Sequence, residues 1–122
     1  MKTALQMQNS EVYDILYRLG LNASSVSFFH AAYAIRIAAG QPGSVTYATK
    51  ILYPAVAKEY GTNWRTVERS LRRASNTAWL SNPELLCELA RHRLYSRPTA
   101  SEFIAILAAY LATLDTSGNK SH

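Results

Sequence analysis

The amino-acid sequence predicts an all-α fold, a six-helix bundle that contains a helix-turn-helix. Three observations support this prediction. Apolar residues recur every three or four positions along nearly the whole chain, which is the spacing of helices with one buried face. Residues that cap or end helices, mainly Ser, Thr, Asn and Gly, separate the periodic segments. No run of alternating β-branched residues indicates a strand.

The first two predicted helices precede a turn rich in proline and glycine. The first spans about residues 10–19; Asn9 or Ser10 can cap its start, and Gly20 can take the left-handed conformation that often follows a helix end. The second spans about residues 25–39 and is apolar on most sides. Because such a helix has almost no polar face to turn to solvent, we expect it to be central and buried.

The third and fourth predicted helices are separated by a glycine. The third spans about residues 46–60 and contains Pro54. Proline lacks an amide donor and clashes with the preceding turn, so we expect either a kink at Pro54 or a later helix start. The fourth spans about residues 63–80, and either Thr62 or Asn63 can cap its start.

The last two predicted helices have clear starts. The fifth begins at Asn82-Pro83, a capping residue followed by a proline in the first turn, where a missing amide costs little. The sixth begins at Thr99 and continues to about residue 114. Thr99 and Glu102, three residues later, form a capping box.

Length, charge and cysteine content restrict the class of protein. A chain of 122 residues suits one domain, and we expect an ordered core of about residues 9–115. The formal net charge of +5 and the isoelectric point of about 9.6 favour an anionic partner, either nucleic acid or an anionic membrane surface. Cys87 stands alone and cannot form an internal disulfide, and no segment has the roughly 20 apolar residues of a membrane span. We therefore expect a cytoplasmic protein.

Nothing in the sequence indicates an enzyme, a cofactor or a metal site. The three histidines, His30, His92 and His122, are scattered, and neither an HExxH nor a CxxC motif is present. No glycine-rich loop suited to cradle a phosphate is present either. His30 lies in an apolar helix, so we interpret it as a partly buried, hydrogen-bonded residue rather than as a ligand.

Residues 56–69 have the sequence form of a helix-turn-helix. One helix ends at Gly61, which can take the positive φ of a sharp turn, and the next helix starts after a capping residue. Ala57 is small enough for two crossing helices to approach each other. The residues that can fill the angle between them are Val56, Tyr60, Val67 and Leu71.

The fourth predicted helix has two different faces. Its apolar face, which we expect to be buried, carries Trp64, Val67, Leu71, Ala74 and Ala78. Its polar face carries Arg65, Glu68, Arg69, Arg72 and Asn76, with Arg73 beside them. Four arginines and one glutamate give residues 64–76 a net charge of +3. The planar fork of arginine can grip a guanine or a phosphate with two hydrogen bonds, so we expect Arg65, Arg69, Arg72 and Arg73 to bind DNA, with Arg69 and Arg72 exposed.

Glu68 stands out among these arginines because a carboxylate repels DNA phosphates. In a helix that faces DNA it should orient arginines or accept from a cytosine amine. The alternative is an ordinary solvated helix with an ion pair from Glu68 to Arg65, Arg69 or Arg72. Outside this helix, we expect Lys50 and Lys58 to face phosphates.

Several strings of residues resemble one family. They are Thr49-Lys50-Ile51-Leu52-Tyr53-Pro54, Val56-Ala57-Lys58, Val67-Glu68-Arg69, Ala78-Trp79, Pro98-Thr99 and Ser101-Glu102-Phe103-Ile104-Ala105. In this order and spacing they resemble the C-terminal effector domains of the stage-zero sporulation protein A family, the response regulators of sporulation. The Leu-Tyr-Pro and Ser-Glu-Phe-Ile-Ala strings are quite specific. The resemblance covers about residues 10–114.

This resemblance implies a six-helix domain with a helix-turn-helix that regulates transcription. It implies binding to double-stranded DNA at a promoter box with a TGTCGAA-like core. It also implies that Glu68, Arg69 and Arg72 occupy the positions that read bases.

The same resemblance implies partners beyond DNA. Copies of the family domain can form a homodimer on tandem sites, and the last helix, with Phe103 and Ile104, matches the region of those dimer contacts. Residues 76–97 include the region where family members touch RNA polymerase. Full-length members carry an N-terminal receiver domain, which we do not expect in this sequence.

A protein-interaction module is the main alternative. A helical bundle of this kind could pair through its last helix with a full-length family member, without specific DNA reading. A role at a membrane surface is weaker, because the basic helix has small residues opposite its charges and not a broad Leu or Phe face.

Overall fold

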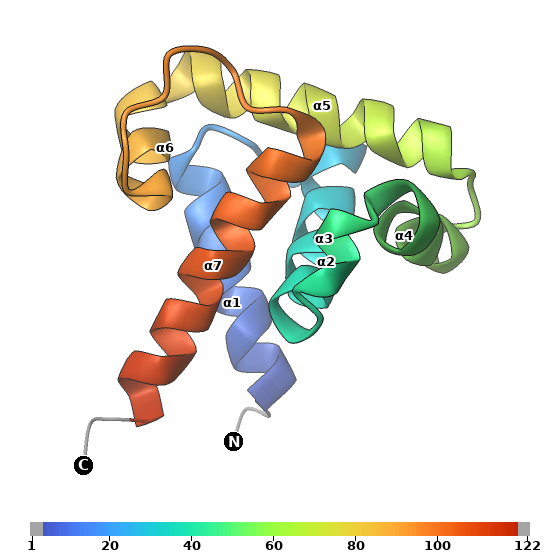
Figure 1. The fold of residues 1–122 in the computed structure, drawn as a ribbon, viewed down its shortest axis with the longest axis horizontal. Helices are drawn as coiled ribbons and strands as arrows, with labels where there is room; N and C mark the ends of the chain where they lie inside the picture. Colours follow the sequence, from blue (N-terminus) through green and yellow to red (C-terminus); the bar gives the residue numbers. More distant parts are fainter. Residues whose placement is uncertain (1–3, 120–122) are drawn as a thin grey trace.

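The computed structural model describes the backbone of residues 4–119 and the side chains of residues 9–114 (Figure 1). The described helices are α1 (Ala4–Arg18), α2 (Val26–Gly40), α3 (Gly43–Thr46), the π-helix η1 (Ala48–Leu52), α4 (Tyr53–Tyr60), α5 (Trp64–Ser81), α6 (Pro83–Ala90) and α7 (Ala100–Asn119). The described backbone has no strand, so the predicted all-α class is confirmed. It contains seven α-helices and one π-helix in place of the expected six helices. No helix in this part of the chain is long and apolar enough to cross a membrane.

The extra elements arise where the sequence predicts a single helix over residues 46–60. The chain instead forms α3, η1 and α4. Pro54 lies in the first turn of α4, where its missing amide costs little, so the later helix start is the outcome. Just before it, the amide of Tyr53 donates to the carbonyl oxygen of Ala48, five residues back, which is the hydrogen bond of a π turn.

The helix α1 begins at Ala4, well before the predicted start. Asn9 and Ser10 lie inside this helix, so neither is its cap and that expectation is wrong. Residues 4–8 are Ala, Leu, Gln and Met, which have high helix propensity and extend the helix without a capping residue.

The helix α2 lies at the centre of the bundle, as predicted. It contacts α1, α4, α5 and α7. Its buried residues are Ser27, Phe28, His30, Ala31, Ala32, Ala34, Ile35 and Ala38. Most of these side chains are small, which lets the neighbouring helices approach closely. Figure 1 shows α5 across the top of the bundle, with the far ends of α1 and α7 at the bottom.

Two predicted caps fix the starts of α5 and α7. Oδ1 of Asn63 accepts from the amide of Thr66 at 2.9 Å. The hydroxyl oxygen of Thr99 accepts from the amide of Glu102 at 3.2 Å, and the carboxylate of Glu102 accepts from the amide of Thr99 at 2.9 Å. This reciprocal pair satisfies two amides that have no partner within the helix, so the capping box is confirmed.

Asn82 joins three helices. Its backbone amide donates to the carbonyl oxygen of Ala78 in α5 at 2.9 Å, and its Oδ1 accepts from the amide of Leu85 in α6 at 3.2 Å. Its Nδ2 donates to the carbonyl oxygen of Arg18 at the end of α1 at 3.1 Å. The predicted helix start at Asn82-Pro83 is confirmed, and one side chain ties α1 to the corner between α5 and α6.

Gly20 follows α1 in a conformation that suits glycine. Its φ is +97°, as its place after the helix predicts. A Cβ built on Gly20 would lie 2.5 Å from Cβ of Ser81 at the end of α5. The backbone conformation and the close approach both exclude a side chain at this position.

Replacing Gly20 with alanine should therefore destabilise the fold. We expect Gly20→Ala to lower the free energy of unfolding by more than about 1 kcal/mol, through the positive φ and the contact with Ser81. Gly40→Ala is the matched control, because no atom lies within 4 Å of its ideal Cβ. It should be neutral or raise stability by up to about 1 kcal/mol. Urea unfolding followed by circular dichroism measures both, and equal effects would contradict this account.

Candidate nucleic-acid interface

Residues 61–63 connect α4 to α5. Gly61 has φ +64° and ψ +40°, the left-handed conformation, and its amide donates to the carbonyl oxygen of Ala57. The amide of Thr62 donates to the same oxygen at 2.9 Å, and Asn63 then caps α5. These bonds end one helix and begin the next within a short turn, and the two helices run in different directions (Figure 1).

One face of α5 is buried in the bundle. Its fully buried apolar residues are Val67, Leu71, Ala74 and Ala78, and α5 contacts α2, α4 and α7. Trp64, in the first turn, is less buried than these residues but packs against the core, in agreement with the expected burial of most of its surface. This ring lies at the edge of the bundle, and the guanidinium of Arg65 lies 5.3 Å from its centroid.

Tyr60, at the end of α4, packs against α2. Its ring meets the ring of His30 edge-on, with 4.9 Å between centroids, and its hydroxyl donates to the carbonyl oxygen of Phe29 at 3.4 Å. The side chain is 42% exposed. The expectation that Tyr60 fills the angle between α4 and α5 is therefore wrong, whereas Val56 and Val67 are fully buried.

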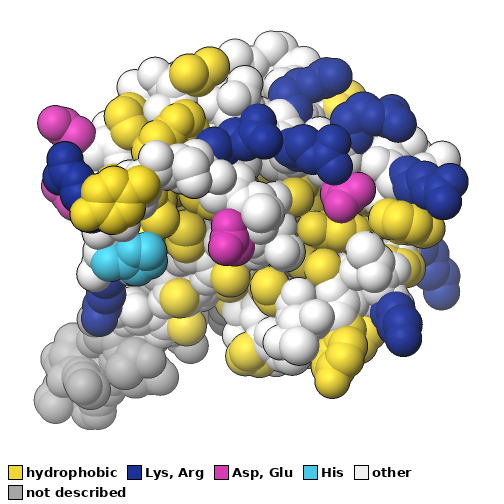
Figure 2. All heavy atoms as spheres, turned by 45° about the horizontal axis from the view of Figure 1, so that its top comes forward, with side chains coloured by type: hydrophobic (Ala, Val, Ile, Leu, Met, Phe, Trp, Pro, Cys, Tyr) yellow, Lys and Arg dark blue, Asp and Glu magenta, His cyan; other side chains and the backbone are white. Residues whose placement is uncertain are grey.

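The remaining surface of α5 is cationic. Its exposed arginines are Arg65, Arg69, Arg72 and Arg73. Figure 2 shows the face of the molecule that carries α5, where a band of lysine and arginine side chains includes few acidic ones. The predicted exposure of Arg69 and Arg72 is confirmed, so both side chains are accessible to an anionic partner.

Glu68 lies among these arginines and pairs with one of them. Its Oε1 is 3.4 Å from Nη2 of Arg72, one helical turn later. Of the three arginines within reach along the helix, the ion pair forms with Arg72. A partly exposed pair on one helix stabilises a protein by only about 0.3–0.5 kcal/mol. Its main effect is to hold the side chain of Arg72 in one orientation.

The two lysines predicted to face phosphates lie outside α5. Lys50 is exposed in η1, and Lys58 is exposed in the last turn of α4. Lys58 therefore belongs to the same pair of helices as the arginine face, whereas Lys50 comes from the element before that pair.

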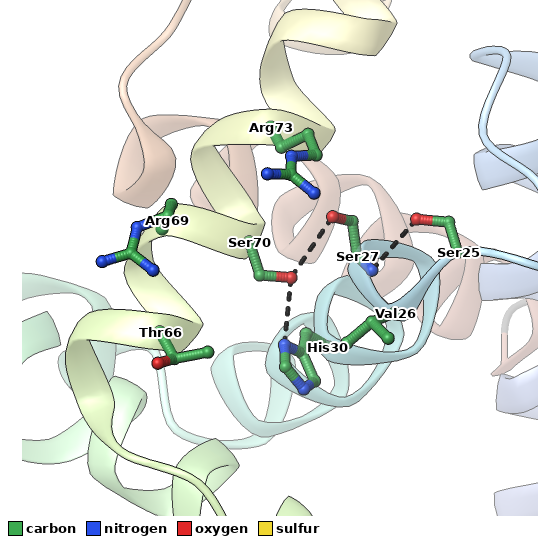
Figure 3. Close-up of a pocket in the computed structure, with 8 residues that line it drawn as sticks. All are labelled: Ser25, Val26, Ser27, His30, Thr66, Arg69, Ser70 and Arg73. Carbon is green, nitrogen blue, oxygen red and sulfur yellow. Dashed lines mark hydrogen bonds between the residues drawn. The ribbon is translucent and has the colours of Figure 1, made fainter.

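A cleft of about 350 Å³ lies between the start of α2 and α5 (Figure 3). Its lining residues are Ser25, Val26, Ser27 and His30 from α2 and its cap, and Thr66, Arg69, Ser70 and Arg73 from one flank of α5. The periodicity of the sequence does not reveal the cleft, because the two helices meet only in the folded bundle. Hydroxyl and arginine residues do recur at helical spacing on one flank of α5, but this spacing alone does not show that α2 lies opposite them.

His30 forms the buried end of this cleft. It is 3% exposed, and its Nδ1 lies 3.0 Å from Oγ of Ser70, whose hydroxyl donates to Oγ of Ser27 at 3.3 Å. Burial lowers the pKa of His30 below its ordinary value, so the ring is neutral at pH 7. The interpretation of His30 as a hydrogen-bonded residue is confirmed, and the ring is more buried than expected. Among the lining residues, Arg69 and Arg73 carry the positive charge.

Phe103 and Ile104 belong to the core. Neither side chain has any exposed surface, because the inner side of α7 packs into the bundle. The expectation that these two residues contact a second copy is therefore wrong for this conformation. Ala109 and Thr113 are exposed residues of the same helix.

Comparison with known protein families identifies one that covers most of this chain. Residues 12–111 match the family described as "Sporulation initiation factor Spo0A C terminal". The matched segment begins inside α1, ends inside α7 and contains every helix between them. This family is the DNA-binding effector domain of a response regulator that controls transcription in sporulation, and it is not an enzyme. Because the match covers most of the chain, the protein belongs to the Spo0A C-terminal family of DNA-binding regulatory domains.

Proposed function

We propose that this chain is a sequence-specific transcription regulator that places α5 in the major groove of double-stranded DNA, with α4 and α5 as a helix-turn-helix. The observation that carries the proposal is the division of α5 into a fully buried face and a face with exposed arginines. A helix about 10–12 Å across fits a major groove about 12 Å wide. The arginines of α5 can then meet the bases while α2, α4 and α7 support the helix from behind.

Glu68, Arg69 and Arg72 are the side chains that we assign to base recognition. Arg69 and Arg72 are three residues apart, so their Cβ atoms lie about 5–6 Å apart on one side of the helix. Each guanidinium can donate two hydrogen bonds to a guanine, and a TGTCGAA-like box offers more than one G·C pair. The ion pair of Arg72 with Glu68 supports this assignment, because it orients the guanidinium before DNA binds.

Phosphate contacts are the proposed role of three other exposed cations, Arg65, Lys50 and Lys58. The net charge of +5 favours such contacts, and the counterions released from DNA strengthen binding at low salt. The whole described chain then acts as one DNA-binding domain, in the cytoplasm.

A homodimer on tandem boxes is a further part of this proposal, with α7 as the contact between copies. Ala105 and Ala109 line two neighbouring hollows, one of about 620 Å³ toward α6 and one of about 270 Å³ toward α2 and α3. Small side chains at these positions let a second helix approach closely. Residues 76–97 are the region that we assign to contact with RNA polymerase.

Base reading by Arg69 can be separated from simple attraction. Arg69→Ala should weaken binding to a TGTCGAA-like box about tenfold or more, because a bidentate guanine contact is worth about 1–3 kcal/mol. Binding to a random duplex should change much less. Lys58→Ala is the matched control: it removes one exposed charge outside α5, so it should weaken both duplexes alike and reduce the salt slope by about one unit.

Fluorescence-anisotropy titrations of both duplexes at several salt concentrations measure these effects. Equal losses on the two duplexes, for Arg69→Ala and for Arg72→Ala, would contradict base reading. The chain would then be better described as an interaction module with a basic face, which pairs through its last helix.

Glu68→Ala tests whether the carboxylate acts through Arg72. Removing a negative charge should strengthen binding to random DNA severalfold, and the unpaired guanidinium should discriminate less between bases. Glu68→Gln keeps the shape of the side chain without its charge and should behave in the same way. Titrations against boxes with single base-pair changes, at matched salt, give the preference at each position. A preference lost at one G·C pair, with unchanged random binding, would show that Glu68 itself reads a cytosine.

Ala109→Gln tests pairing through α7 without changing the net charge. A longer side chain on this surface should remove most of the cooperativity on a duplex with two tandem boxes, and should leave the affinity for a single box unchanged. Ser96→Gln, at an exposed loop position, is the matched control. Titrations and sedimentation of the two-box complex measure the coupling. Unaltered cooperativity in Ala109→Gln would exclude this surface, and independent binding of the unchanged chain to the two boxes would exclude pairing.

A further inference from the structure

The cleft between α2 and α5 combines positive charge with hydroxyl groups. Its two guanidinium groups belong to Arg69 and Arg73, one helical turn apart, and no carboxylate is among its lining residues. Figure 3 shows Arg73 extending from α5 beside the hydrogen-bonded group of Ser70, Ser27 and His30, whereas Arg69 extends away from this group on the other side of Ser70. Guanidinium and hydroxyl donors together are the set that proteins use to hold phosphate oxygens.

The charges in this cleft are not neutralised by the protein. Within residues 9–114, Arg72 has an ion pair with Glu68, whereas none joins Arg69 or Arg73 to an acidic side chain. Two like charges that line one open cleft attract an anion, and the start of α2 adds the partial positive charge of a helix N-terminus. Two arginines without an ion pair therefore line the cleft beside α2.

The inner wall of the cleft is hydrogen-bonded and uncharged. His30 is buried and neutral, and its bond to Ser70 holds the hydroxyl that donates to Ser27. Oγ of Ser25 already accepts from the amide of Ser27 at 3.1 Å. Because these groups are held by one another, an anion that enters the cleft meets a prearranged surface and two exposed guanidinium groups.

The direction of Arg73 differs from that of Arg72, one of the residues assigned to bases. Neighbouring residues of an α-helix are rotated by about 100°, so Arg73 projects toward α2 while Arg72 projects from the outer face. When a helix lies in the major groove, its outer face meets the base edges and its flanks lie nearest the two phosphate backbones. Arg73 is therefore placed to meet the backbone.

We propose that this cleft holds one phosphate of the DNA backbone, gripped mainly by Arg73 with Arg69 at its edge. The inference rests on the proposed function, and it gives Arg73 a positioning role without sequence information. It also makes the start of α2 part of the DNA interface.

Neutral methylphosphonates, placed one at a time in the backbone of a TGTCGAA-like duplex, test this assignment. For the unchanged protein, one position beside the box should weaken binding about tenfold. Arg73→Ala should weaken binding to the box and to random DNA by a similar factor, reduce the salt slope by about one unit, and abolish the effect of that methylphosphonate. Arg73→Lys should keep most of the affinity, because a phosphate accepts a lysine as a point charge.

Arg18→Ala is the matched control. It removes one exposed positive charge from a different hollow, which also contains Glu88. It should leave the effect of every methylphosphonate unchanged. Thermal melts of all three variants should coincide with that of the unchanged chain, because both arginines are exposed.

Two results would overturn the inference. One is an Arg73→Ala protein that keeps the full response to the methylphosphonate or that changes base preference. The other is a protein that shows no methylphosphonate effect but binds inorganic phosphate at micromolar concentration in the absence of DNA, as measured by nuclear magnetic resonance. The cleft would then be a site for a small free anion. The unchanged protein could also bind random DNA as tightly as the box and still show the methylphosphonate effect that depends on Arg73. This result would contradict the proposed base recognition but would support the phosphate site.

Discussion

The burial of one side of α5 is the constraint on which the rest of the interface depends. Val67, Leu71, Ala74 and Ala78 pack into the bundle with no exposed surface. Turning α5 by one residue, about 100°, would carry an arginine into the core, where an unpaired charge costs several kcal/mol. Packing therefore sets the direction of every arginine on this helix, including those that line the cleft beside α2.

The central helix α2 connects this face to the bundle through polar contacts as well as apolar ones. His30 and Ser70 are far apart in the chain, and each satisfies the other where a lone polar group would be costly to bury. A hydrogen bond has a narrower range of distance and angle than an apolar contact, so this pair fixes how α5 sits along α2. The serines and arginines on either side of the cleft are thus held in register.

Much of the fold could be predicted because its signals lie within single turns. Asn63 and Thr99 start helices by bonds to residues three positions later, and such bonds can be predicted from spacing. Two features of the fold could not be predicted in this way. The division of residues 43–60 into three elements around Pro54 depends on packing, and the early start of α1 depends on helix propensity without a capping residue. The arginine face follows from helical periodicity. The cleft and the burial of Phe103 and Ile104 do not, because they depend on which helices meet across the bundle.

Asn82, the residue that joins α1, α5 and α6, has a chemical advantage from its neighbour. Asparagine side chains deamidate when the backbone nitrogen of the next residue attacks the side-chain carbonyl and closes a cyclic imide. In this step the backbone nitrogen loses its hydrogen. The nitrogen of Pro83 carries no hydrogen. The amide of Asn82 is thus shielded from this route of deamidation, and the junction of three helices keeps the donor and the acceptor that it needs.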